Sequence, residues 1–107
     1  MKLLRLLDLI IKEYIAIVEI LAEDYPIEEN RVIIEREEFK KLLGKYAYAT
    51  FTEKIKAYKD LNLIIHDANN YTMPHKDKEL KKTIRKVIIN YKAYQRVKYL
   101  YNKEVNV

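Results

Sequence analysis

A run of hydrogen-bonding side chains lies between residues 66 and 78. It combines imidazole, amide, hydroxyl and ammonium groups: His66, Asn69, Asn70, Tyr71, Thr72, His75, Lys76 and Lys78. An asparagine amide can bond adenine through two atoms, and hydroxyl and ammonium groups contact phosphate oxygens. Asp67 is the one discordant charge, and it either accepts a hydrogen bond from a cytosine amino group or caps a turn. This mixture favours contact with duplex nucleic acid.

The sequence gives little indication of a catalytic or metal site. The chain has no cysteine and only two histidines, His66 and His75, without a spaced carboxylate or thiolate partner. A zinc site usually needs at least three protein ligands. Glu28 and Glu29 lie in a polar connection with no nucleophile or histidine nearby. We therefore expect no enzymatic activity, no metal and no cofactor.

The elements that would position the run begin with a strand and two short helices. Val32–Ile34 is β-branched and predicts a strand. A helix follows over Glu35–Leu43, and Gly44, the only glycine, is expected to end it in the left-handed conformation. Thr50 and Glu53 then form the pattern of a capping box. They start a second helix that ends near Leu61-Asn62.

A β-hairpin is expected directly after these helices. Leu63–Ile65 and Tyr71–Met73 are two short runs with high β-propensity. Asn69-Asn70 between them suits a tight turn, because asparagine tolerates a positive φ. Pro74 would end the second strand, since it cannot donate to a ladder. A hairpin of this kind would carry the polar run at its tip.

The second helix offers a weaker surface for nucleic acid than the hairpin. With Phe51, Ile55 and Tyr58 pointing inward, its outer face has two acidic residues, Glu53 and Asp60. The positions left for contact are Thr52 and Lys56 on this face and Lys54 at its edge. We expect the hairpin to carry at least as much of the contact as this helix. The alternative is that Asn69-Asn70 is only a turn.

Long helices flank this central part. Met1–Asp24 is apolar over most of its circumference, which is wider than an ordinary surface helix needs. We expect part of it to pair with a second copy through Leu3, Leu7, Ile10, Tyr14 and Ile17. The alternative is that the C-terminal helix covers this surface within one chain. Charged residues such as Arg5, Asp8 and Lys12 interrupt the run, so neither a membrane span nor a signal peptide is expected.

The C-terminal helix is expected from Lys76 to about Asn102. Its apolar stripe would be formed by Leu80, Ile84, Val87, Ile88, Tyr91 and Tyr94. Lysines and arginines fill the remaining positions. They either form a solvated face or, at the helix start beside the hairpin, reach phosphates. Its tyrosines are expected to pack rather than to stack on bases.

Chain length, charge and cysteine content limit the classes of protein to which this chain can belong. A chain of 107 residues fits one domain over residues 1–107, mainly α with a small β-hairpin, in an α+β arrangement. The net charge of +5 hides an asymmetry: residues 1–38 carry five basic and ten acidic side chains, whereas residues 39–107 carry sixteen and six. The second part is thus suited to face a polyanion. Absence of cysteine fits a reducing cytoplasm, which is the expected location.

Taken together, the segment from Val32 to Pro74 resembles the winged helix-turn-helix superfamily. The resemblance rests on the acidic start of the first helix, the EEFKKLLG segment, the capped second helix and the LNLII run before a polar hairpin. It implies binding to duplex DNA. The small size, the composition rich in Tyr, Lys, Ile and Asn, and the flanking helices are also similar to relaxosome accessory proteins of conjugative plasmids. That resemblance implies binding at an origin of transfer, as a homodimer and beside other DNA-processing proteins.

Two alternatives stay open on the sequence. The same fold and charge would suit a transcriptional regulator. A protein-interaction module is the alternative of another class, in which the basic surface would meet an acidic partner protein.

Overall fold

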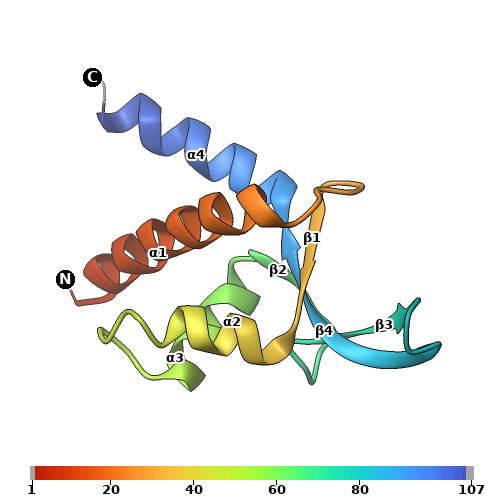
Figure 1. Ribbon diagram of the computed structural model, residues 1–107. Coiled ribbons are helices and arrows are strands. Elements are labelled where there is room, and N and C mark those ends of the chain that lie inside the picture. The colour runs from red at the N-terminus through yellow and green to blue at the C-terminus, as the bar shows by residue number, and fades with distance from the viewer. Residues whose placement is uncertain (1, 106–107) are drawn as a thin grey trace.

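The computed structural model describes residues 2–105, and the side chains of residues 5–103. Within that range the chain is α+β, with four helices and a small antiparallel sheet of four strands (Figure 1). The elements in order are α1 (Lys2–Asp24), β1 (Arg31–Ile34), α2 (Arg36–Leu43), α3 (Phe51–Asp60), β2 (Ile64–Ile65), β3 (Met73–Asp77), β4 (Lys82–Asn90) and α4 (Tyr91–Val105). The mixed α+β class is as predicted.

Helix α1 lies between α4 on one side and the α2–α3 pair on the other (Figure 1). Its wide apolar surface is therefore used within the chain. Ile10, Tyr14 and Ile17 are fully buried in the core, so the prediction that these three residues form a subunit interface is wrong. Leu7 remains partly exposed, and the side chain of Leu3 lies outside the described residues. No helix in residues 2–105 is long and apolar enough to cross a membrane.

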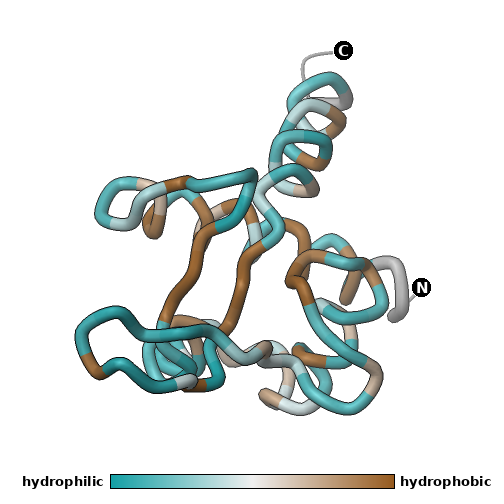
Figure 2. The backbone as a smooth tube through the Cα atoms, turned by 90° about the vertical axis from the view of Figure 1, so that its right-hand side faces the viewer, coloured by the Kyte–Doolittle hydropathy of each residue, from teal (hydrophilic) through white to brown (hydrophobic). Residues whose placement is uncertain are grey.

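Strand β4 is the centre of the sheet. Its second half pairs with β1 on one edge and with β2 on the other, and its first half pairs with β3. In the second half, Val87, Ile88 and Ile89 are all buried, as expected of a strand covered on both faces. The hydrophobic stretches of backbone gather in the middle of the molecule and the loops around it are mostly hydrophilic (Figure 2).

The start of the C-terminal helix was predicted wrongly. Residues 76–90 are strands and a turn, and α4 begins only at Tyr91. Asn90 stands at the change from strand to helix: its side-chain oxygen accepts a hydrogen bond from the Ala93 amide at 3.2 Å, as a helix N-cap does. Its own carbonyl accepts the buried Tyr14 hydroxyl at 2.6 Å, which attaches this junction to α1.

The two short helices are close to prediction. Thr50 and Glu53 form the capping box, with bonds of 3.1 and 2.9 Å between each side chain and the other's backbone N–H. Strand β1 and helix α2 also lie where the sequence placed them. Gly44 is different: its φ of −65° is right-handed, so the helix ends there without the left-handed turn that was expected.

Candidate nucleic-acid interface

The β3–β4 hairpin projects from the body of the molecule (Figure 1). Five residue pairs hold it, from Met73 opposite Lys86 to Asp77 opposite Lys82, and residues 78–81 form its turn. Because opposite residues of an antiparallel pair share a face, Lys76 and Thr83 point to one side and Asp77 and Lys82 to the other. The hairpin is longer than predicted and begins about where the predicted hairpin was to end.

The turn of this hairpin is held by Asp77. One carboxylate oxygen accepts hydrogen bonds from the backbone N–H groups of Glu79 and Leu80, both at 2.9 Å. The hydrogen bond from the Leu80 amide, above all, lowers the pKa of Asp77 from 3.8. Lys81 completes the turn with a φ of 54°, a left-handed conformation. The tip is thus fixed in shape by its own backbone and one side chain.

Two cations hold the base of the hairpin against the body. The Lys86 ammonium lies 3.2 Å from Glu35, at the start of α2, and 3.4 Å from Asp77. Chiefly through the hydrogen bond with Glu35, the pKa of Lys86 is raised from 10.5. Arg85 donates to the hydroxyl of Thr72 at 2.9 Å and to its carbonyl at 2.6 Å, and it lies 3.3 Å from Asp67. These two cations are therefore engaged in contacts within the fold.

Four lysines of the hairpin are exposed: Lys76, Lys78, Lys81 and Lys82. None of them has an acidic partner within 4.0 Å among the described side chains. Glu79 is the only acidic side chain in the turn. The outer part of the hairpin therefore carries an uncompensated positive charge, which attracts a polyanion.

The polar run around Asn69 and Asn70 does not form the hairpin tip, which corrects the prediction. These two residues are exposed in the loop 66–72, before β3, and neither has a positive φ. The Asp67 carboxylate accepts hydrogen bonds from both of their amides, at 3.0 and 2.8 Å. The first of these bonds, with Asn69, contributes most to lowering the pKa of Asp67 from 3.8. Asp67 is thus the residue that orders this loop, and both amide side chains remain free at the surface.

Other residues of the predicted interface divide into exposed and buried ones. Thr72 is buried under Arg85, and Tyr71 packs on Phe51 with ring centroids 5.6 Å apart. His66 is half-buried, with its ring nitrogens 2.9 and 3.1 Å from the carbonyls of Asp67 and Lys59. His75 lies half-buried in β3, and Pro74 lies inside that strand instead of ending it. The exposed polar groups of this region are therefore the amides of Asn69 and Asn70 in loop 66–72 and the lysines of the hairpin.

Helix α3 presents little positive charge. Lys56 is exposed but forms an ion pair with Asp60 at 3.0 Å, and Thr52 is exposed beside the capping Glu53. Lys54 is buried, with 1% of its surface exposed, so the prediction that it lies at the edge of a contact face is wrong. From this position its ammonium cannot reach a phosphate. The expectation that this helix offers a mediocre surface agrees with the geometry.

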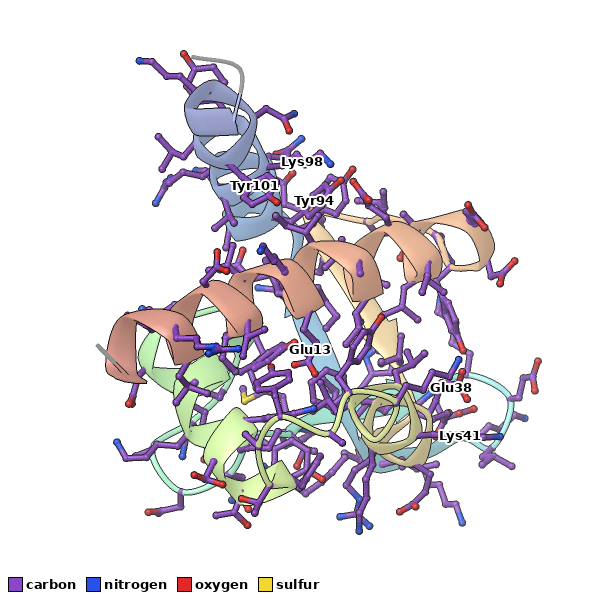
Figure 3. All side chains as sticks on the ribbon, turned by 90° about the vertical axis from the view of Figure 1, so that its left-hand side faces the viewer. Glu13, Glu38, Lys41, Tyr94, Lys98 and Tyr101 are labelled. Carbon is purple, nitrogen blue, oxygen red and sulfur yellow. The ribbon has the colours of Figure 1, made fainter. Side chains whose placement is uncertain are left out.

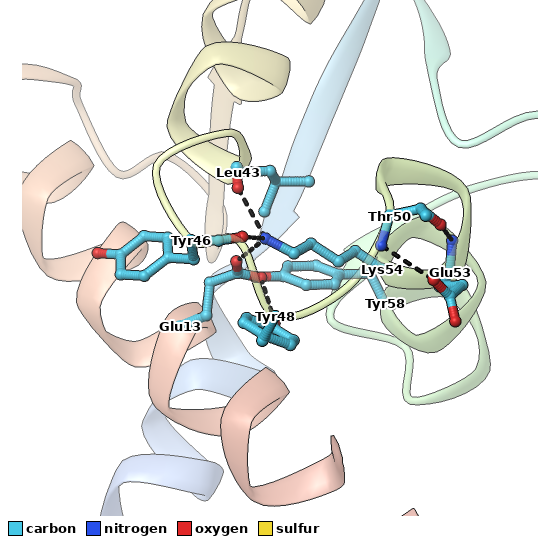
Figure 4. Close-up of polar contacts among 8 residues, drawn as sticks. All are labelled: Glu13, Leu43, Tyr46, Tyr48, Thr50, Glu53, Lys54 and Tyr58. Atoms are coloured by element: carbon cyan, nitrogen blue, oxygen red, sulfur yellow. Dashed lines mark hydrogen bonds and ion pairs between the residues drawn. The ribbon is translucent and has the colours of Figure 1, made fainter.

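The ammonium of Lys54 is instead the centre of a buried polar cluster, formed by Glu13, Lys54, Tyr48 and Tyr58 (Figure 4). It donates to a Glu13 oxygen and to the Leu43 carbonyl, both at 2.7 Å, and to the Tyr46 carbonyl. The other Glu13 oxygen accepts the hydroxyls of Tyr48 and Tyr58 at 2.9 and 2.8 Å. Figure 3 shows Glu13 on the side of α1 that faces α2 and α3, with Tyr94, Lys98 and Tyr101 of α4 on the opposite side.

This cluster orients α3. Each of the three protons of the Lys54 ammonium has an acceptor, and no side-chain N or O atom in the described part of the core lacks a partner. Burial, followed by the charge of Glu13, raises the pKa of Tyr58 far above 10.0. A fully satisfied buried network specifies one arrangement of its helices, because any other leaves a charge unpaired. The cluster has no capacity left for a ligand.

Lys81 and Lys82 are exposed lysines of the hairpin that the residues chosen from the sequence did not include. Both were expected near the start of the C-terminal helix, with a solvated face or contact with phosphates as the alternatives. Two signals could have found them: the β-branched residues Thr83, Ile84, Val87, Ile88 and Ile89 favour a strand, and the preceding segment Asp77–Lys81 is polar with an aspartate at its start. Together they describe a turn leading into a strand.

Two apolar depressions adjoin each other at Leu7. One, of about 290 Å³, lies between α1 and α4 and is lined by Leu7, Asp8, Ile11, Val97, Leu100 and Tyr101. The other, of about 310 Å³, lies between α1 and α3 and is lined by Leu6, Leu7, Glu53, Lys56, Ala57, Asp60 and Leu61. Leu100 and Leu61 are 52% and 39% exposed. This continuous apolar surface is on the helical side of the molecule.

Neither the family models nor the curated proteins searched contain a match to this chain. Within the described residues no group of three or more His, Asp or Glu side chains could hold a metal ion. The geometry of the hairpin, the loop and the apolar surface is thus the basis for the functional argument.

Proposed function

We propose that this protein is a sequence-specific duplex DNA-binding protein with a winged helix-turn-helix architecture, and that it binds as a homodimer. The order of a helix, a strand, two short helices and a strand, followed by a projecting hairpin, supports that architecture. In it α3 is the second helix of the helix-turn-helix and the β3–β4 hairpin is the wing.

The observation that carries the proposal is the set of four exposed and unpaired lysines on the hairpin. Lysine contacts to phosphates supply much of the affinity of DNA-binding proteins. On α3, by contrast, Lys54 is buried and Lys56 is paired with Asp60. The hairpin is therefore the principal DNA-binding element, and α3 a secondary one.

Base recognition is assigned to loop 66–72. Arg85 joins this loop to the hairpin, because it bonds Thr72 and Asp67 from its position in β4. Asn69 and Asn70 are thereby held beside the lysine-rich hairpin with their side-chain amides exposed. Asparagine is well suited to read adenine. Replacing both by alanine is expected to reduce discrimination between sequences more than affinity for random DNA.

The homodimer is assigned to the apolar surface around Leu7 and Leu100, in place of the residues that proved to be buried. Leucine and valine side chains that line an open depression lose contact with water when a second copy covers them. Two copies would present two hairpins, so the DNA site is expected to be paired or repeated. Leu100→Glu should shift the mass measured by light scattering from dimer to monomer. Ile27→Glu, at another exposed position, is the matched control and should leave the dimer intact; a monomeric unaltered protein would contradict the assignment.

The test of DNA binding is fluorescence anisotropy with fragments from the surrounding replicon, in the presence of random competitor DNA. Two variants with the same loss of charge decide where the DNA lies. Replacing Lys78, Lys81 and Lys82 by glutamine should reduce the slope of log K against log salt by about 2.7 per protomer, from about 0.9 for each phosphate contact. Replacing the exposed Lys92, Arg96 and Lys103 of α4 by glutamine should leave the slope nearly unchanged.

The outcomes separate the alternatives. Equal losses in both variants would leave net charge as the whole explanation and refute an interface at the hairpin. No binding to any DNA, with capture of an acidic protein, would favour the protein-interaction module. The resemblance to relaxosome accessory proteins makes an origin of transfer the first DNA to test. Selective binding to a promoter instead would make the protein a transcriptional regulator.

A further inference from the structure

Leu80 is an apolar side chain in the otherwise polar turn of the β3–β4 hairpin. It is 58% exposed, more than Leu61 at 39% or Leu100 at 52%. Unlike those two leucines, it borders neither of the apolar depressions. Its neighbours in the turn are Lys78, Glu79 and Lys81, followed by Lys82. A leucine at this position contributes nothing evident to the fold.

The backbone holds this leucine in a fixed position. The Leu80 amide donates to the Asp77 carboxylate at 2.9 Å, and the left-handed Lys81 closes the turn on its other side. The five residue pairs of the hairpin extend about 16 Å at about 3.3 Å per residue. The minor groove of B-DNA is about 7.5 Å deep but only about 6 Å wide, so the side chains of the turn can enter it while the paired strands stay outside.

From these features we propose that Leu80 is a wedge that enters the minor groove, separates two stacked base pairs and bends the DNA. The inference rests on the proposed DNA-binding function and adds a mechanical action to it. The surrounding lysines draw the tip to the phosphates on both sides of the groove, and the apolar side chain finds cover between the bases. Proteins that insert an apolar side chain at a base step kink the duplex by about 20–90°.

The charges at the tip favour DNA over an apolar protein partner. Lys78, Lys81 and Lys82 outnumber Glu79 in and beside the turn, and a purely apolar partner surface would have to remove three ammonium groups from water. Between two phosphate strands these groups remain paired. A leucine surrounded by lysines is therefore suited to bind a polyanion that has an apolar interior. In a DNA duplex the phosphates are the polyanion and the stacked bases are the apolar interior.

The experiment compares DNA bending with DNA binding. The DNA is a duplex that the protein binds selectively in the anisotropy experiment. A fluorophore at each end reports the end-to-end distance by energy transfer. In separate duplexes, 2-aminopurine placed at successive base steps reports unstacking by its fluorescence. The unaltered protein should shorten the end-to-end distance and raise the 2-aminopurine fluorescence at one step. Leu80→Ala should lose both signals while it keeps the same salt slope, since its lysines remain. Leu80→Met should retain them, and Ile27→Ala is the control for loss of an exposed apolar side chain elsewhere.

The outcomes keep the two proposals apart. If the unaltered protein binds no duplex at any salt concentration, the DNA-binding function falls and the wedge falls with it. If it binds without bending, or if Leu80→Ala bends DNA as well as the unaltered protein does, only the wedge is refuted. Sedimentation with vesicles of phosphatidylserine and phosphatidylcholine tests the other polyanion with an apolar interior. Binding to these vesicles that depends on Leu80, without bending of DNA, would assign the tip to a lipid surface and overturn the proposal.

Discussion

Lys54 and Lys82 show two opposite uses of the same side chain. Lys54 is 1% exposed and donates to a carboxylate and two carbonyls, whereas Lys82 is exposed and has no acidic partner within 4.0 Å among the described residues. The Lys54 charge is removed from water and depends on its protein partners, whereas the Lys82 charge remains in contact with water. The comparison teaches that positive charge in this chain has two functions, orientation of α3 in the core and attraction at the hairpin.

The largest effect is expected in the core. Lys54→Met leaves Glu13 charged and buried without its counter-ion, which costs about 3–5 kcal/mol of the free energy of unfolding. Urea denaturation followed by circular dichroism measures it. Lys82→Met is the matched substitution on the hairpin and should change the stability by less than about 0.5 kcal/mol.

A double variant tests whether the loss arises from the unpaired charge. In Glu13→Gln/Lys54→Met the amide oxygen still accepts from Tyr48 and Tyr58, and no charge remains buried. More than half of the stability lost in Lys54→Met should return, because replacing both partners of a buried pair is often nearly neutral. A double variant as unstable as the single one would show that packing of the lysine chain, and not its charge, holds α3.

The second largest effect is expected at alkaline pH, which should destabilise the core around the buried tyrosines. Burial is the largest cause that raises the pKa of Tyr14, Tyr48, Tyr58 and Tyr94 above the usual 10.0. These tyrosines ionise near pH 10 in the unfolded chain and at higher pH in the folded one. Their contribution to stability is complete below pH 10 and is lost as the pH rises toward the folded values.

Absorbance of tyrosinate against pH, with circular dichroism in parallel, checks this expectation. Ionisation of these four tyrosines should coincide with unfolding, and Tyr58→Phe should make the unfolding less steep in pH. Full ionisation of all ten tyrosines near pH 10 in a folded protein would contradict the burial of the cluster.

The sequence contained a usable signal for the buried pair. Lys54 is three residues from Phe51 and four from Tyr58, so it shares the inward face of α3 with them. Glu13 likewise stands between Ile10 and Ile17 on the buried side of α1. An acid and a base at two inward positions suggest a buried ion pair. What the sequence could not provide is that the two helices meet at these residues, since 41 positions separate them.

Strand β4 shows a different limit. Leu80, Ile84, Val87 and Ile88 fit helical spacing, and Ile84, Val87, Ile88 and Ile89 equally fit a strand. Pairing with β1, some 55 positions earlier in the chain, decides for the strand: Val32 lies opposite Ile89 and Ile34 opposite Val87. Such distant pairing overrides local helical periodicity, and the β-branched residues near residue 85 do not identify the partner strand. Local signals had mixed outcomes: the capping box and the strand at Val32 agree with the structure, whereas the left-handed Gly44 and the turn at Asn69-Asn70 do not.

Thr50→Ala separates the contribution of the N-cap from that of the buried ion pair. It removes the side-chain cap at the start of α3 and leaves the Glu13–Lys54 pair in place. The loss of the hydrogen bond from the Glu53 amide should cost about 1 kcal/mol, as N-cap substitutions usually do. Urea denaturation measures it, and Thr52→Ala, one exposed residue inside the helix, is the control and should change little. A loss as large as that of Lys54→Met would mean that the cap, and not the buried pair, sets the position of α3.

The smallest effect is expected at the hairpin, from Asp77→Asn. Asp77 holds the amides of Glu79 and Leu80, and its pKa is below 3.8 mainly because of the Leu80 hydrogen bond. A carboxylate with a lowered pKa contributes order that is complete above about pH 3.8 and is lost as the pH falls through the folded value. The protection of these two amides, which is their hydrogen exchange relative to the intrinsic rate at each pH, should therefore fall at acid pH in the unaltered protein. It should depend less on pH in Asp77→Asn, while the protection of α3 stays unchanged in both. Leu80, Lys81 and Lys82 all lie in or beside this turn. Loss of protection confined to the turn would show that the hairpin is ordered locally, independently of the buried pair that orders the helices. Loss of protection that spread to α3 would instead show that the hairpin and the core unfold as one cooperative unit. The surroundings of Lys54 and of Lys82 would then not be independent of each other.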